Sequence, residues 1–144
     1  MHSLGNTRSG FTVVELMIVV AVLAVVVALA LPGVEQARKT AFEGRAVGML
    51  KTYGTANQQY RVRFGIYASS EVDLLNTSYL HRNPNAGVNG YEYTYVFNPP
   101  NSWALTATPD LPGSTGDRFF FVDHTNVIRF EALGPAGPGS PPLD

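Results

Sequence analysis

Apolar residues form one long, almost unbroken run near the beginning of the chain. Between Phe11 and Leu31 there are 21 residues, and only Thr12 and Glu15 among them are polar. At the rise of an α-helix, about 1.5 Å per residue, the run reaches roughly 31 Å, the thickness of the hydrocarbon core of a bilayer. The pattern therefore predicts a membrane-spanning helix over residues 11–31, with one carboxylate close to its beginning.

A second apolar pattern, with helical periodicity, follows Pro32. From Val34 to Phe64 the chain has no proline, and apolar residues recur at spacings of three and four. The members of this apolar stripe are Phe42, Ala46, Met49, Tyr53, Ala56, Tyr60 and Phe64. Residues 32–64 are therefore predicted to continue the helix as an amphipathic segment that packs its stripe against a sheet.

Turn residues and alternating apolar residues divide the following region into one short helix and four strands. The long helix should end near Phe64-Gly65, and Ser70 with Asp73 predicts the beginning of a helix over 71–75. The expected strands are 91–97, 103–108, 118–122 and 127–130. Two successive hairpins make them a four-stranded antiparallel meander, which buries one face on the stripe.

The expected fold is therefore α+β, with a globular domain over 65–133 after the long helix. Residues 134–144 contain four prolines and three glycines, and this composition predicts a disordered tail. Residues 1–10 are polar and too few to fold, so we interpret them as a leader peptide. Arg8, just before the apolar run, favours a cytoplasmic location for this end.

The composition excludes several classes of function. The formal net charge is −1, which gives no indication of a nucleic-acid partner. The chain has no cysteine, which removes disulfides, thiol catalysis and cysteine-bound metals. Neither the histidines nor the acidic residues near the end of the chain follow a metal-ligand spacing, so we expect no metal and no other cofactor. These residues are His2, His81, His124, Asp110, Asp117 and Asp123.

No motif of a known catalytic type accompanies them. The chain contains neither the Gly-x-Ser-x-Gly pattern of a nucleophile elbow nor a phosphate-binding glycine loop. We therefore predict that the chain is not an enzyme.

Four aromatic residues, Tyr91, Tyr93, Tyr95 and Trp103, lie on the predicted strands, with the three tyrosines on one face. We interpret this face as part of the core. In the alternative interpretation the face is exposed and holds a ligand, and the protein is a membrane-anchored extracytoplasmic binding module that does not polymerise.

Glu15 separates the possible explanations of the apolar run. Ala28-Leu29-Ala30 resembles the cleavage site of a secretory signal peptide, but the apolar region of such a peptide usually has about 7–15 residues. A plain membrane anchor explains the length but not the carboxylate, which costs on the order of 2.5–3.5 kcal/mol inside an apolar span. A satisfactory explanation must therefore supply Glu15 with a partner.

The run Gly10-Phe11-Thr12-Val13-Val14-Glu15-Leu16 resembles the processing motif of type IV pilins and of the pseudopilins of type II secretion. The resemblance implies that a prepilin peptidase cuts between Gly10 and Phe11 and methylates the new amino group of Phe11. It also implies that Glu15 neutralises the Phe11 amino group of a neighbouring subunit, and that the long helix kinks at Pro32. The implied fold, a long helix whose second half lies on a small antiparallel sheet, agrees with the pattern described above.

The resemblance predicts a structural filament subunit, of a type IV pilus or of a type II secretion pseudopilus, and both uses stay open. Before assembly we expect a single-pass protein of the inner membrane with its domain in the periplasm. Assembly then gives a helical homopolymer, at the cell surface for a pilus or in the periplasm for a pseudopilus. The expected partners are other copies of the chain, the prepilin peptidase and an inner-membrane assembly machinery.

Overall fold

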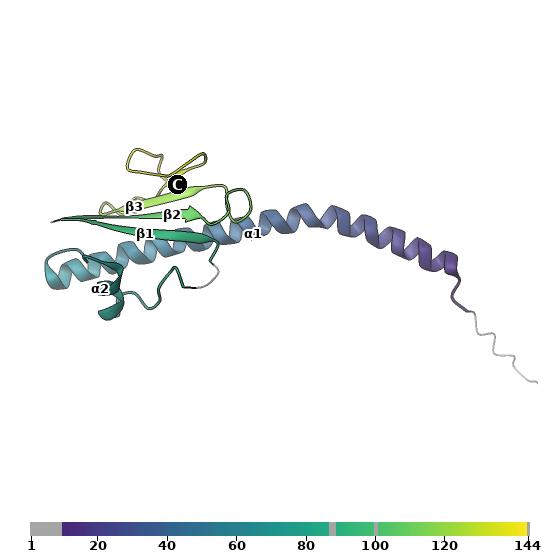
Figure 1. Ribbon diagram of the computed structural model, residues 1–144, viewed down its shortest axis with the longest axis horizontal. Coiled ribbons are helices and arrows are strands. Elements are labelled where there is room, and N and C mark those ends of the chain that lie inside the picture. Colours follow the sequence, from purple (N-terminus) through teal and green to yellow (C-terminus); the bar gives the residue numbers. More distant parts are fainter. Residues whose placement is uncertain (1–9, 87–88, 100, 144) are drawn as a thin grey trace, which may run out of the picture. The chain divides into compact units, whose positions relative to one another are not determined.

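The structure is a computed structural model and describes residues 10–86, 89–99 and 101–143 (Figure 1). Two helices come first, α1 (Val13–Phe64) and α2 (Glu71–Asn76). Four strands follow, β1 (Tyr91–Asn98), β2 (Ser102–Pro109), β3 (Phe119–Asp123) and β4 (Arg129–Glu131). The fold is therefore α+β, as predicted. The chain divides into two compact units, Met1–Glu35 and Gln36–Asp144.

The first unit contains the beginning of α1. Of the predicted leader, 1–10, all but Gly10 lies outside the described residues. The side chains described between Phe11 and Val34 are all exposed, and the helix includes a stretch that is long and apolar enough to cross a membrane. α1 continues as one helix through position 32, and the kink predicted at Pro32 stays a prediction.

The four strands of the second unit form one antiparallel sheet in the order β1-β2-β3-β4, which confirms the predicted meander. Tyr93 of β1 is opposite Ala107 of β2, and Leu105 of β2 is opposite Val122 of β3. Burial alternates at every position of β2, as expected of a strand with one face in a core.

The buried face of the sheet packs on the part of α1 that belongs to the second unit. The core cluster includes Ala46, Leu50, Tyr53 and Ala56 of α1 together with Trp103, Leu105, Phe120 and Val122 of the sheet. The predicted stripe is correct in its middle but wrong at its end, because Phe64 is 46% exposed. It also omits Leu50 and Asn57, which are fully buried, since a helix against a sheet buries a face broader than one line of residues.

The short helix α2 begins where Ser70 and Asp73 predict it. The Ser70 hydroxyl accepts a hydrogen bond from the Asp73 amide at 3.4 Å, and the Asp73 carboxylate accepts one from the Ser70 amide at 3.0 Å. This reciprocal capping box satisfies amides that the first turn of a helix leaves without partners. Leu74 is then buried in the core.

Residues 134–143, named here the C-terminal strap, differ from the disordered tail that their composition predicts. Phe130 N donates to Pro141 O at 3.0 Å, and Leu143 N donates to Ile128 O at 2.8 Å, so the strap lies along β4. Leu143 also packs against the core cluster. Composition misses this arrangement because the outer edge of β4 offers backbone partners, which a count of prolines and glycines does not register.

Candidate processing and assembly site

The peptide bond between Gly10 and Phe11 lies before the first turn of α1. Neither residue is part of the helix, and the Phe11 side chain is 76% exposed. A Cβ atom added at Gly10 meets no atom within 4 Å. The predicted cleavage site is therefore accessible and free of helical hydrogen bonds, as a peptidase requires of the bond that it cuts.

Thr12 and Glu15 together form the beginning of α1. The Glu15 amide donates to the Thr12 hydroxyl at 3.2 Å. In return, Glu15 Oε2 accepts from the Thr12 amide at 2.9 Å and from the Thr12 hydroxyl at 2.8 Å. This is a capping box, in which a threonine before the first turn and a glutamate three residues later satisfy each other's backbone amides.

Sequence reasoning missed the role of Thr12 and treated it only as a polar residue in an apolar run. The signal was present, since Thr followed three residues later by Glu, just before an apolar stretch, is the sequence signature of a capping box. The pairing fixes the Glu15 carboxylate in the first turn of the helix, just after the predicted cleavage site.

The Glu15 carboxylate keeps one oxygen available. Within the described residues, its hydrogen bonds all involve Oε2, and no cation lies within ion-pair distance of it. The neighbours of Glu15 along the helix, such as Val14 and Leu16, are apolar and exposed. Glu15 is thus a carboxylate with half of its acceptor capacity unused, at one end of a membrane-length apolar surface.

The aromatic residues of the sheet do not form a ligand surface. Tyr91, Tyr93 and Trp103 are at most 4% exposed and belong to the core cluster. Burial raises the pKa of Tyr93 to about 12, well above the ordinary value of a phenol. Tyr95 is half-buried, and its hydroxyl donates to Ala68 O at 2.7 Å. The interpretation of this face as core is confirmed, and the binding-module alternative loses the surface on which it depended.

The acidic residues considered as metal ligands have other partners or lie apart. Asp117 accepts from Lys39 Nζ at 3.1 Å, and Asp123 accepts from the Thr125 amide at 2.9 Å. Over residues 10–86, 89–99 and 101–143, no group of three or more His, Asp or Glu side chains is arranged to hold a metal ion. His81 and His124 are both exposed, far apart in sequence.

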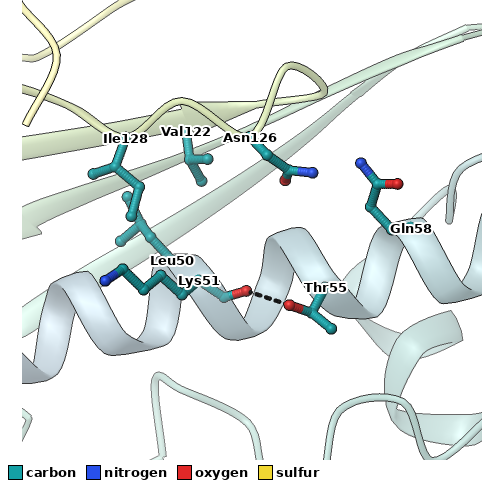
Figure 2. A pocket seen from close by; sticks show the side chains of 7 residues that line it. All are labelled: Leu50, Lys51, Thr55, Gln58, Val122, Asn126 and Ile128. Carbon is teal, nitrogen blue, oxygen red and sulfur yellow. Dashed lines mark hydrogen bonds between the residues drawn. The ribbon is translucent and has the colours of Figure 1, made fainter.

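A groove of 490 Å³ lies between α1 and the β3–β4 turn (Figure 2). Leu50, Val122 and Ile128 give it an apolar wall, and its other lining residues are Lys51, Thr55, Gln58 and Asn126. The Thr55 hydroxyl donates back to Lys51 O at 3.0 Å, in the manner of a threonine inside a helix. Lys51 is the charged residue of this lining, and no carboxylate or imidazole among the described residues lines the groove beside it.

In a comparison with known protein families, residues 5–31 match the prokaryotic N-terminal methylation motif. No curated protein matches the chain. The match covers Gly10, Phe11, Thr12 and Glu15, and it implies processing by a prepilin peptidase and a pilus-type assembly machinery in general. An apolar N-terminal helix fits anchoring in a membrane before assembly. The chain therefore carries, at residues 5–31, the signature of type IV pilins and pseudopilins.

Proposed function

We propose that this protein is a structural subunit of a helical filament, of a type IV pilus or a type II secretion pseudopilus, and that it polymerises through the apolar part of α1. The observation that carries the proposal is Glu15, a carboxylate on an apolar helix surface with one oxygen, Oε1, left over by the Thr12 capping box. The motif at residues 5–31 supports the same class of protein.

The proposed partner of Glu15 is the amino group that cleavage creates. A prepilin peptidase cuts between Gly10 and Phe11 and methylates the amino group of Phe11, which keeps its positive charge. In a bundle of apolar helices this amino group and a carboxylate attract each other strongly, and either charge alone is costly. Glu15 of one subunit therefore pairs with Phe11 of the next, which sets the register of neighbouring helices.

The apolar surface of residues 11–31 gives the filament its core. Before assembly the inner membrane holds this segment, with the domain of the second unit in the periplasm. Leaving the membrane exposes roughly twenty apolar residues, and only another apolar environment makes that acceptable. A bundle of identical helices supplies this environment, and a head-to-tail contact repeated by a screw rotation gives an open filament.

The proposal is tested by replacing Glu15 in cells that assemble the protein. Glu15→Ala removes the carboxylate, and Glu15→Gln keeps the shape of the side chain without its charge. Glu35→Ala is the matched control, because Glu35 is an exposed glutamate of the same helix outside the apolar run. We expect both Glu15 variants to be cleaved and to remain in the membrane, but not to enter sheared or secreted filaments.

Filaments at normal amounts in both Glu15 variants would show that the pairing with Phe11 does not direct assembly. A loss of filaments with Glu35→Ala as well would show that general damage to α1, and not the Glu15 charge, is responsible. Cells that carry the assembly genes and make the unaltered, cleaved chain should form filaments. If they form none, the proposed function itself is contradicted.

A further inference from the structure

Both outer edges of the sheet are occupied by groups that are not strands, and we infer that these groups keep the sheet from pairing with a strand of another chain. β1 and β4 are the outer strands in the order β1-β2-β3-β4. An outer strand presents a row of backbone donors and acceptors, which readily template pairing with a second chain. The inference concerns the second unit alone and does not depend on the proposed filament.

The C-terminal strap covers the edge of β4. Phe130 and Ile128 exchange hydrogen bonds with the strap residues Pro141 and Leu143, and Arg129 stands opposite Pro142 in an antiparallel bridge. In this pattern the backbone groups that join the two segments belong to residues 141 and 143. The backbone of Pro142 therefore faces away from β4, toward any further strand that approaches.

Pro142 gives this new outer edge no donor. Proline lacks an N–H, and an edge strand accepts it where that side of the backbone faces solvent. Of the neighbouring amides, Leu143 N is bonded to Ile128 O, and Ser140 N donates to Gly137 O at 3.1 Å. Between residues 140 and 143, no backbone N–H is left to pair with another chain.

The edge of β1 is blocked by a side chain. The Asn85 amide group binds Tyr93 on both sides, with Nδ2 donating to Tyr93 O at 2.8 Å and Oδ1 accepting from Tyr93 N at 2.8 Å. Tyr93 is a central residue of β1, and both of its backbone groups point away from β2. The carboxamide of Asn85 therefore copies the hydrogen bonds of a neighbouring strand at one position.

A small turn holds Asn85 in place. The side chain of Pro84 is fully buried, which anchors the loop before β1 to the domain. Asn85 N donates to Asn83 Oδ1 at 2.8 Å, and Ala86 N donates to Asn83 O at 3.2 Å. An anchored turn of this kind presents Asn85 to β1 at little further cost in conformational entropy.

Two substitutions remove the blocks, and each has a matched control. Asn85→Ala and Asn85→Lys lose the same two hydrogen bonds, but a lysine on an edge opposes pairing by its charge. Pro142→Val adds an outward N–H and a residue that favours strands, and it leaves the strap bonds of residues 141 and 143 intact. Pro138→Val is its control, since Pro138 is an exposed proline of the strap outside the bridge with β4.

The experiment compares full-length chains in detergent micelles over a range of concentrations. We expect Asn85→Ala with Pro142→Val to shift the amide I infrared band toward that of intermolecular strands and to lose the smallest species in size-exclusion chromatography. Pairing of α1 helices alone adds no strand signal. The unaltered chain, Pro138→Val and Asn85→Lys alone should show neither change.

An unshifted infrared band for the Asn85→Ala and Pro142→Val double variant overturns the inference. Association of Asn85→Lys alone to the same extent as the double variant overturns it too, because lost stability would then be the cause. Near-ultraviolet circular dichroism of buried Trp103 at low concentration reports whether each variant is folded. If Asn85→Ala unfolds the domain, the test rests on the Pro142→Val variant with Asn85 intact. The inference is rejected if this variant shows no more intermolecular strand signal than Pro138→Val.

Discussion

Glu43 of α1 and Arg118, just before β3, form a bidentate contact that joins two segments 75 residues apart. Arg118 Nε and Nη2 lie 2.8 and 2.7 Å from Glu43 Oε2, and the amide of Asp117 donates to Glu43 Oε1 at 3.0 Å. The Arg118 guanidinium also lies over the rings of Phe120 and Phe130. Glu43 therefore fixes the position at which the chain enters β3.

Replacement of Glu43 should destabilise the second unit more than the loss of its neighbouring ion pair. Glu43→Ala leaves the Asp117 amide and the Arg118 guanidinium without their acceptor, at a cost of about 1–3 kcal/mol. Lys39→Ala removes the more exposed pair with Asp117 and should cost less than about 1 kcal/mol. Chemical denaturation followed by Trp103 fluorescence measures the free energy of unfolding of both variants. Equal losses of stability in the two variants would contradict the larger role given to Glu43.

Gly48 and Gly54, both in α1, should respond differently to alanine. A Cβ at Gly48 meets nothing within 4 Å, so Gly48→Ala should stabilise the helix by up to about 1 kcal/mol. A Cβ at Gly54 overlaps Asn126 Oδ1, so the Asn126 side chain must move aside, and Gly54→Ala should stabilise the helix less than Gly48→Ala does. Thermal denaturation of the two variants measures this difference. Adding Asn126→Gly should remove the difference, since Asn126 has a φ of 60° that glycine adopts without strain.

The capping box of α2 should make a pH-dependent contribution to stability. Hydrogen bonds from Ser69, its hydroxyl foremost, and from Ser70 hold the pKa of Asp73 below its ordinary value. A lowered pKa in the folded state means that the contribution is complete above the unfolded pKa and is lost as the pH falls through the folded pKa. The stability difference between the unaltered chain and Asp73→Asn should therefore be largest near neutral pH and shrink in acid.

Denaturant titrations of both chains across the acid range measure that difference. Ser70→Ala serves as a comparison, because it removes the cap hydroxyl at any pH and should cost about 0.5–2 kcal/mol throughout. A difference for Asp73→Asn that grows as the pH falls contradicts the direction of the shift.

At the beginning of α1, the hydroxyl of Thr12 should matter more than its shape. Thr12→Val is isosteric but removes the group that accepts from the Glu15 amide, at a typical cost of about 1 kcal/mol to the first turn. Thr12→Ser retains the hydroxyl. Hydrogen exchange in micelles should show a faster Glu15 amide in Thr12→Val and a nearly unchanged one in Thr12→Ser. Equal rates in the three chains leave the capping box without a role in holding the helix end.

The mature chain should begin at N-methylated Phe11. Mass spectrometry of the N-terminal peptide from membranes tests this directly, and a chain beginning at Leu31 supports cleavage by an ordinary signal peptidase. Gly10→Val should prevent the cut. Because a Cβ at Gly10 meets no atom within 4 Å among the residues that the structure describes, we expect the effect to fall on recognition by the peptidase and not on the fold.

The elements of the fold could be predicted because their signals are local. The capping pair of Ser70 and Asp73, and the alternation along β1 and β2, lie within a few residues of the structures that they specify. Burial of Glu43 and Asn57 could not be read in the same way. Their partners are Arg118, just before β3, and Tyr95 of β1, which lie 75 and 38 residues further along the chain.

The candidate site shows the same division. Gly10, Phe11 and Glu15 could be proposed as site residues because their motif is continuous in sequence, and the pairing of Thr12 with Glu15 is equally local. The C-terminal strap could not be predicted, because its order comes from the edge of β4 and from packing of Leu143 on the core. Local composition indicates only how a segment behaves without tertiary contacts, whereas the strap is ordered by its contacts with the rest of the domain.

The contact between Glu43 and Arg118 also has a consequence for biosynthesis. During translation, the stripe of α1 is complete long before β3 leaves the ribosome, since the two partners are 75 residues apart. Local hydrogen bonds let the helix form early, whereas closing the core must wait for the distant strands. A nascent chain therefore exposes an apolar helix face at Ala46, Leu50 and Tyr53 until β2 and β3 arrive, and a ribosome stalled before residue 119 holds a substrate for chaperones.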